Sequence, residues 1–146
     1  MAIAALVTWL IAAVGGFYML AGWMARGGTR DPEASRFSPM LILSHFILAA
    51  AGLVLWIVYL VSDITALAWI ALILLLPVAV LGFTMFARWL PSYQARAEVA
   101  TGGATGGTAR STVAEAQFPV VVVGAHGLFA VATVVLVLLA TLGVGT

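Results

Sequence analysis

The sequence contains no cysteine and few charged side chains: among 146 residues there are six basic ones, all arginine, and five acidic ones. Without cysteine the chain has no disulfide, no thiolate ligand for a metal and no cysteine nucleophile. Charged residues make up 8% of the sequence, whereas a soluble domain carries about 25%. The net charge of +1 also argues against nucleic acid as a partner. These shortages exclude a soluble globular domain.

Long uncharged runs are what the sequence has instead. Hydrophobic residues make up 64% of the chain, and the mean hydropathy is +1.21. About 20 apolar residues span the hydrocarbon core of a bilayer, so each of the four runs can cross it. The runs are Met1–Ala25, Phe37–Ser62, Ile64–Ala87 and Ala116–Thr146. They predict an all-α fold, an integral-membrane up-down-up-down four-helix bundle, with the lipid bilayer as its surroundings.

The boundaries of the four spans follow from turn and capping residues. We expect one transmembrane domain over 1–146, with helices at about 2–25, 40–62, 66–90 and 117–142. The first run has no basic segment before it and no small-residue cleavage site after it, so we interpret it as a retained helix. The second and third runs are joined by a very short link and should be antiparallel neighbours. A flexible linker is expected over about 91–116, because 101–112 reads TGGATGGTARST.

The arginines predict the orientation in the membrane. All six lie in or beside the segments that join helices 1 to 2 and 3 to 4. By the positive-inside rule these segments are cytoplasmic, and we expect a bacterial cytoplasmic membrane or its equivalent. Both termini are then on the non-cytoplasmic side.

Two histidines, His45 and His126, lie inside predicted spans, where ionisable residues are functional candidates. Each follows the cytoplasmic start of its helix, at depths of about 9 and 12 Å. Helices 2 and 4 run in the same direction and occupy opposite corners of the predicted bundle. Two histidines at one depth can therefore face each other across the core and bind one planar macrocycle from both sides.

Small residues follow each histidine on the same helical stripe. They are Ala49 and Gly52 after His45, and Ala130 and Thr133 after His126. Small side chains on opposing helices leave room for a flat ligand. The alternative is structural, because small residues also line ordinary transmembrane interfaces and a buried histidine can join two helices by a hydrogen bond.

The segments LSHFILAAAG (43–52) and GAHGLFAVAT (124–133), on this four-helix layout, resemble the membrane-bound b-type cytochromes. The resemblance implies one bis-histidine haem b per chain, with His45 and His126 as metal ligands. It also implies electron transfer, with a quinone or a redox protein as partner, and makes the chain a possible oxidoreductase or electron-transfer component. The alternative hypothesis is a cofactor-free membrane accessory subunit or scaffold, with structural histidines.

Other candidate residues are few. Arg88, at the cytoplasmic end of helix 3, is placed to pair with haem propionates, although an arginine there also serves as a topology anchor. No catalytic residue is predicted, because no acidic residue lies inside a span and no Ser-His-Asp set is present. In helix 1, Ala12 and Gly16 form a small-xxx-small pair, which favours close packing within the bundle or between copies in a homo-oligomer or larger complex.

Overall fold

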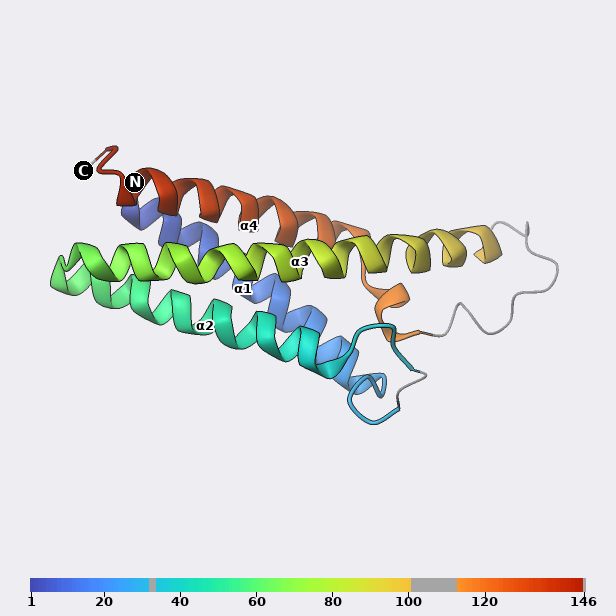
Figure 1. The fold of residues 1–146 in the computed structure, drawn as a ribbon. Coiled ribbons are helices and arrows are strands. Elements are labelled where there is room, and N and C mark those ends of the chain that lie inside the picture. The colour runs from blue at the N-terminus through green and yellow to red at the C-terminus, as the bar shows by residue number, and fades with distance from the viewer. Residues whose placement is uncertain (32–33, 101–112, 146) are drawn as a thin grey trace.

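The computed structural model describes residues 1–31, 34–100 and 113–145. Within these ranges the chain forms four long α-helices and a short 3-10 helix, without any strand. In chain order the elements are α1 (Ala2–Ala25), α2 (Pro39–Ser62), α3 (Thr65–Ala100), η1 (Ala114–Gln117) and α4 (Val120–Thr141). The prediction of an all-α, four-helix protein is confirmed (Figure 1).

Local sequence explains where α2 begins and ends. The Ser38 side chain accepts a hydrogen bond from the backbone N–H of Leu41, and Pro39 occupies the first helical position, where its missing N–H costs nothing. Asp63 ends the helix in the left-handed conformation, with φ 55°, which aspartate tolerates better than most residues. α3 then begins at Thr65, so the turn between the two helices is very short.

The linker expected over about 91–116 differs from the structure. α3 continues through Pro91 to Ala100, and Ala114–Gln117 form η1. A proline removes one backbone donor without ending every helix, and the following stretch SYQARA contains good helix formers. The 36 residues of α3 rise about 54 Å, well beyond a hydrocarbon core of about 30 Å. Residues 101–112 lie outside the described ranges.

The helices pack as two pairs. α1 lies mainly against α4, and α2 mainly against α3, while α3–α4 and α1–α2 make lesser contacts. The ammonium group of Met1 donates to the Gly145 carbonyl at 3.0 Å, so the two ends of the chain are adjacent (Figure 1). At the opposite end, Arg26 Nε donates to Gln117 Oε1 at 3.2 Å.

The outer surface of the bundle is strongly apolar. All four helices are long and apolar enough to cross a membrane, and most residues in each span are not buried by the protein itself. The most exposed large side chains include Val14, Ile47, Val61, Phe83 and Val121. Burial within the chain does not account for these side chains, and a lipid environment would.

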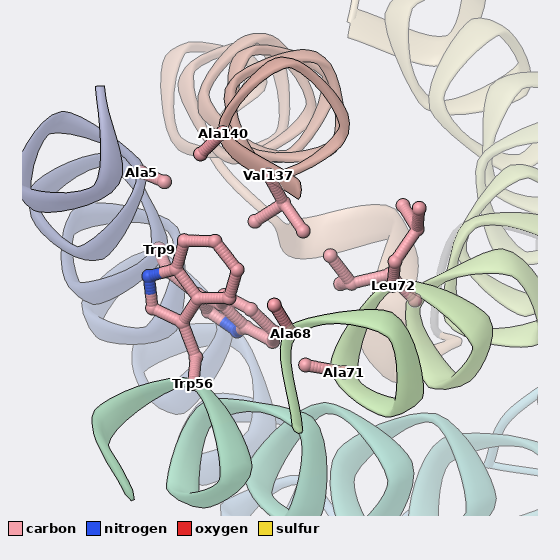
Figure 2. Close-up of a cluster of buried hydrophobic side chains, with 9 residues drawn as sticks. Ala5, Trp9, Trp56, Ala68, Ala71, Leu72, Val137 and Ala140 are labelled. Atoms are coloured by element: carbon pink, nitrogen blue, oxygen red, sulfur yellow. The ribbon is translucent and has the colours of Figure 1, made fainter. Parts of the chain in front are cut away.

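Buried residues form two separate clusters. The terminal cluster, near the chain ends, consists of Ala5, Trp9, Trp56, Ala68, Ala71, Leu72, Leu75, Val137 and Ala140. Figure 2 shows Trp9 and Trp56 projecting into it from α1 and α2. The loop cluster, at the other end, consists of Trp23, Phe37, Trp89, Ala114 and Phe118.

A buried carboxylate fixes the loop end of the bundle. Glu115 of η1 is fully buried, and it accepts hydrogen bonds from Ser35 Oγ at 2.8 Å and from the Arg36 backbone N–H at 2.7 Å. Trp23 Nε1 in turn donates to Ser35 Oγ at 2.8 Å. The segment before α4 is therefore joined to α1 and to the start of α2, although the sequence suggested a flexible linker there.

Between the two clusters no residue is buried on any of the four helices. This interval, which we call the histidine layer, comprises residues 13–22, 38–51, 79–88 and 119–132. Its shortest segments rise about 15 Å. Protein interiors are normally filled to crystal-like density. The middle of this bundle is therefore covered by protein atoms only in part, at one level on all four helices.

Candidate functional site

His45 and His126 meet within the histidine layer. Their ring centroids are 6.3 Å apart, and the ring planes are inclined by 58°. Both side chains are half-buried. The structure thus brings together the two residues that the sequence singled out, one from α2 and one from α4.

Each imidazole is held by a backbone carbonyl of the helix paired with its own. His45 Nδ1 lies 3.0 Å from the carbonyl oxygen of Val78 in α3, and His126 Nδ1 lies 2.8 Å from that of Ala12 in α1. A carbonyl can only accept, so Nδ1 carries the proton, and in a neutral imidazole Nε2 then has the free lone pair. Metal-bound histidines use this arrangement, which orients the ring and makes Nε2 a better ligand.

The distance between the rings fits one metal between two imidazoles. Two imidazoles that bind a metal from opposite sides, each at about 2 Å from nitrogen to metal, have ring centres roughly 6 Å apart. The observed 6.3 Å matches this value. It also lies within the range of ordinary aromatic ring contacts, about 4.5–7 Å. The donor set and its spacing therefore fit a bis-histidine haem and also fit a pair of structural histidines.

Glycines allow the close approach of each ring to the neighbouring helix. A Cβ at Gly16 of α1 would lie 3.3 Å from Cε1 of His126, and a Cβ at Gly82 of α3 would lie 3.2 Å from Cε1 of His45. Both distances are tighter than ordinary Cβ contacts. A larger residue at either position would push the imidazole away from its carbonyl partner.

The small residues expected beside the histidines lie in two different environments. Ala49 and Ala130 are half-buried in the histidine layer, as a flat ligand would require. Gly52 lies just beyond the layer, where a Cβ would be 3.1 Å from the Trp9 ring, so it makes room for an indole. Thr133 is buried, and its hydroxyl donates to the Phe129 carbonyl at 2.7 Å and lies within hydrogen-bond distance of Thr8 Oγ1, at 3.0 Å.

Arg88 is exposed at the loop end of the bundle. It lines a shallow depression together with Arg36, Ala87 and Pro91. Trp89, the next residue, is buried in the loop cluster, so Arg88 is about 100° around the helix from a residue that points inward. The role of Arg88 toward a propionate remains a prediction.

The environment of one histidine repeats that of the other. Gly16 follows the acceptor Ala12 by one helical turn, and Gly82 follows the acceptor Val78 by the same spacing. Both glycines begin the pattern GFxMxAxW, which reads GFYMLAGW at 16–23 and GFTMFARW at 82–89. α1 therefore corresponds to α3, and α2, with His45, corresponds to α4, with His126.

Buried positions follow the same correspondence. Trp23 and Trp89, at the ends of the two patterns, are both buried in the loop cluster. Phe37 and Phe118, each eight residues before its histidine, are buried there as well. The pairing of α1 with α4 likewise corresponds to that of α3 with α2. The bundle thus consists of two similar two-helix halves, and the histidines lie where the halves meet.

Sequence reasoning missed the partners of the histidines. The acceptors are backbone carbonyls of Ala12 and Val78, and a backbone carbonyl cannot be recognised from the residue type. Gly16 was assigned to general helix packing, and Gly82 was not singled out, although the repeated GFxMxAxW pattern points to both.

The site was also searched for further metal ligands, and the chain was compared with known proteins. Among the described residues there is no group of three or more His, Cys, Asp or Glu side chains that could hold a metal ion. Comparison of the chain with protein-family models, curated proteins and solved structures finds no match.

Proposed function

We propose that this chain is an integral-membrane b-type cytochrome that binds one haem between α2 and α4. The observation that carries the proposal is the pair His45 and His126, with ring centres 6.3 Å apart and both Nδ1 atoms engaged by carbonyls. Nε2 of each imidazole would hold the iron. The bound group would supply reversible one-electron transfer.

The chain's own residues prepare both ligands in the same way. In the neutral imidazole, the hydrogen bonds to Val78 and Ala12 place the proton on Nδ1, leave Nε2 as the ligand atom and fix the ring orientation. Gly16 and Gly82 let the rings reach those carbonyls. The terminal cluster and the loop cluster fill the bundle on either side of the histidine layer, and a macrocycle would lie in this partly covered layer.

The proposal includes helices that alternate in direction across a bacterial cytoplasmic membrane. Four apolar spans, adjacent chain ends and the Arg26–Gln117 contact at the opposite end support this arrangement. The arginine-bearing loops would be cytoplasmic and the termini outside. The haem would then lie toward the cytoplasmic side and would not by itself carry electrons across a core of about 30 Å. A quinone, a redox protein or a further subunit completes the path.

The test is the absorbance of the purified protein. We expect a Soret band and the spectrum of a low-spin, six-coordinate b haem in the wild type, and loss of the bound haem in both His45→Ala and His126→Ala. Ser44→Ala, next to His45, is the matched control and should retain the spectrum. A band that survives both histidine substitutions would overturn the assignment.

The second candidate is a cofactor-free membrane scaffold. It is favoured by the same two hydrogen bonds, because each one joins the helices of a tightly packed pair. On this hypothesis the protein stays colourless even after haem is supplied. Each histidine substitution would then cost only about 0.6 kcal/mol, typical of hydrogen bonds within membranes.

A further inference from the structure

Two arginines lie together at the loop end of the bundle, on the side of α3 that carries Arg88. Arg36, just before α2, and Arg88 of α3 line one depression. Within the described residues neither guanidinium has an acceptor. Glu115 bonds the Arg36 backbone N–H and is already shared with Ser35, and Asp31 lines a second depression together with Arg36. Two like charges therefore face a common space.

On the side of α1 and α4, the position equivalent to this depression is occupied by another arginine side chain. By the correspondence of the helices, Gly22 takes the place of Arg88 and Gln117 the place of Arg36. The guanidinium of Arg26 lies there, with Nη1 donating to the Gly22 carbonyl at 2.9 Å and Nε donating to Gln117 Oε1. The cation on the side of α1 and α4 is bonded within the protein, whereas the side of α2 and α3 presents two cations outward.

The position of the depression on α3 indicates which kind of anion binds there. Ala87, Arg88 and Pro91 line it, whereas Trp89 and Ser92 of the same helix are buried. The depression is thus on the flank of α3 turned away from the bundle interior. Arg36 precedes the candidate span of α2, which begins at Pro39, so the depression lies beside the end of that span, the level expected for lipid headgroups.

The geometry points to a binding site for the phosphate of an anionic phospholipid at Arg36 and Arg88. Arginine forms paired hydrogen bonds with phosphate oxygens, and basic pockets between transmembrane helices on the cytoplasmic side bind lipid headgroups. The inference depends on membrane insertion and is independent of haem binding.

The experiment measures the binding of phosphatidylglycerol and phosphatidylcholine to the delipidated, detergent-purified full chain by native mass spectrometry. We expect the wild type to bind phosphatidylglycerol more tightly than phosphatidylcholine. Arg36→Gln/Arg88→Gln should weaken phosphatidylglycerol binding roughly tenfold or more. Arg36→Gln keeps the backbone bond to Glu115, so the loop end stays intact. Arg30 is an exposed arginine of the same loop that does not line this depression, so Arg30→Gln is the control for loss of positive charge in this loop and should bind like the wild type.

The next three kinds of result would overturn the assignment to a lipid phosphate. Equal binding of the two lipids, or unchanged binding by the double variant, would show that the arginine pair does not recognise a lipid phosphate. Displacement of the lipid by millimolar inorganic phosphate would show a site for free phosphate. A changed haem content or midpoint potential in the double variant, with lipid binding unaltered, would assign the pair to propionates. A colourless wild type that still prefers phosphatidylglycerol would refute the cytochrome proposal and leave this one standing.

Discussion

Trp9 of α1 lies against Gly52 of α2, so closely that a Cβ at Gly52 would be 3.1 Å from two carbon atoms of the indole. Both residues are buried, and Trp9 belongs to the terminal cluster. A rigid ring in a filled cluster has little room to move.

We therefore expect Gly52→Ala to destabilise the protein by about 1–3 kcal/mol, the usual cost of overpacking. Thermal unfolding in detergent, followed by circular dichroism, measures this. Gly127→Ala is the control, because a Cβ there meets nothing within 4 Å. Its expected effect is neutral or stabilising by up to about 1 kcal/mol, since alanine favours helix. A Gly52 variant as stable as this control would contradict the close contact with Trp9.

Gly16 and Gly82 should control how well the histidines bind haem. In Gly16→Ala and Gly82→Ala the new methyl group must displace an imidazole by a few tenths of an ångström, which weakens its bond to the carbonyl. We expect both variants to retain less haem than the wild type, and to similar extents, because the two environments correspond. The measurement is the ratio of Soret to protein absorbance after purification.

The control for this pair is Gly124→Ala, also in the histidine layer and on the same helix as His126. A Cβ at Gly124 meets nothing within 4 Å, so haem content should remain at the wild-type level. If Gly124→Ala lost as much haem as the other two variants, the cause would be glycine loss in general and not crowding of the imidazoles.

Glu115 should be important for stability although it lies in a connection between helices. Glu115→Ala leaves Ser35 Oγ and the Arg36 N–H without their acceptor, and a buried group that loses its partner costs about 1–3 kcal/mol. Glu115→Gln keeps one oxygen and should lose less. Asp63→Asn, at an exposed position where asparagine also tolerates positive φ, should stay within about 0.5 kcal/mol of the wild type. Equal stability of Glu115→Ala and Asp63→Asn in thermal unfolding would contradict the importance of this carboxylate.

The orientation in the membrane can be tested with single cysteines, since the chain has none of its own. In intact cells an impermeant maleimide should label Asp63→Cys, at the turn between α2 and α3, and should spare Thr29→Cys, in the loop after α1. Both positions are exposed, so accessibility within the protein does not limit either reaction. After cell lysis both should be labelled. The reverse pattern in intact cells would refute the orientation inferred from the arginines.

The four spans were predictable because charge and turn residues mark most of their ends. Arg26 follows α1, and Ser38 with Pro39 opens α2. The end of α3 was not, because a linker was expected from about residue 91, whereas Pro91 and the residues after it continue the helix. η1 was missed for a related reason: a glycine- and threonine-rich stretch nearby suggested a solvated linker, and burial of Glu115 depends on Ser35, a residue distant in sequence.

The meeting of His45 and His126 was predictable from helix direction and depth alone, since both follow the starts of parallel spans by similar distances. The orientation of their rings was not, because it depends on carbonyls of α1 and α3, and every residue carries a carbonyl. The neighbour of Gly52 was not predictable either. Its small size was interpreted as space for a ligand, and in the structure the Trp9 ring of another helix lies against it, while a role of Gly52 toward a ligand stays a prediction.

The correspondence between the two halves gives the chain a freedom that a symmetric dimer of two-helix subunits would not have. In such a dimer every substitution occurs twice, once in each subunit. Here α1–α2 and α3–α4 belong to one polypeptide, so each can change alone. Gly22 and Gln117 accompany an internally bonded Arg26 on one side, and Arg88 and Arg36 form an outward-facing cationic pair on the other. The two flanks of the bundle can thus specialise for different neighbours in the membrane while the matched surroundings of the two imidazoles are preserved.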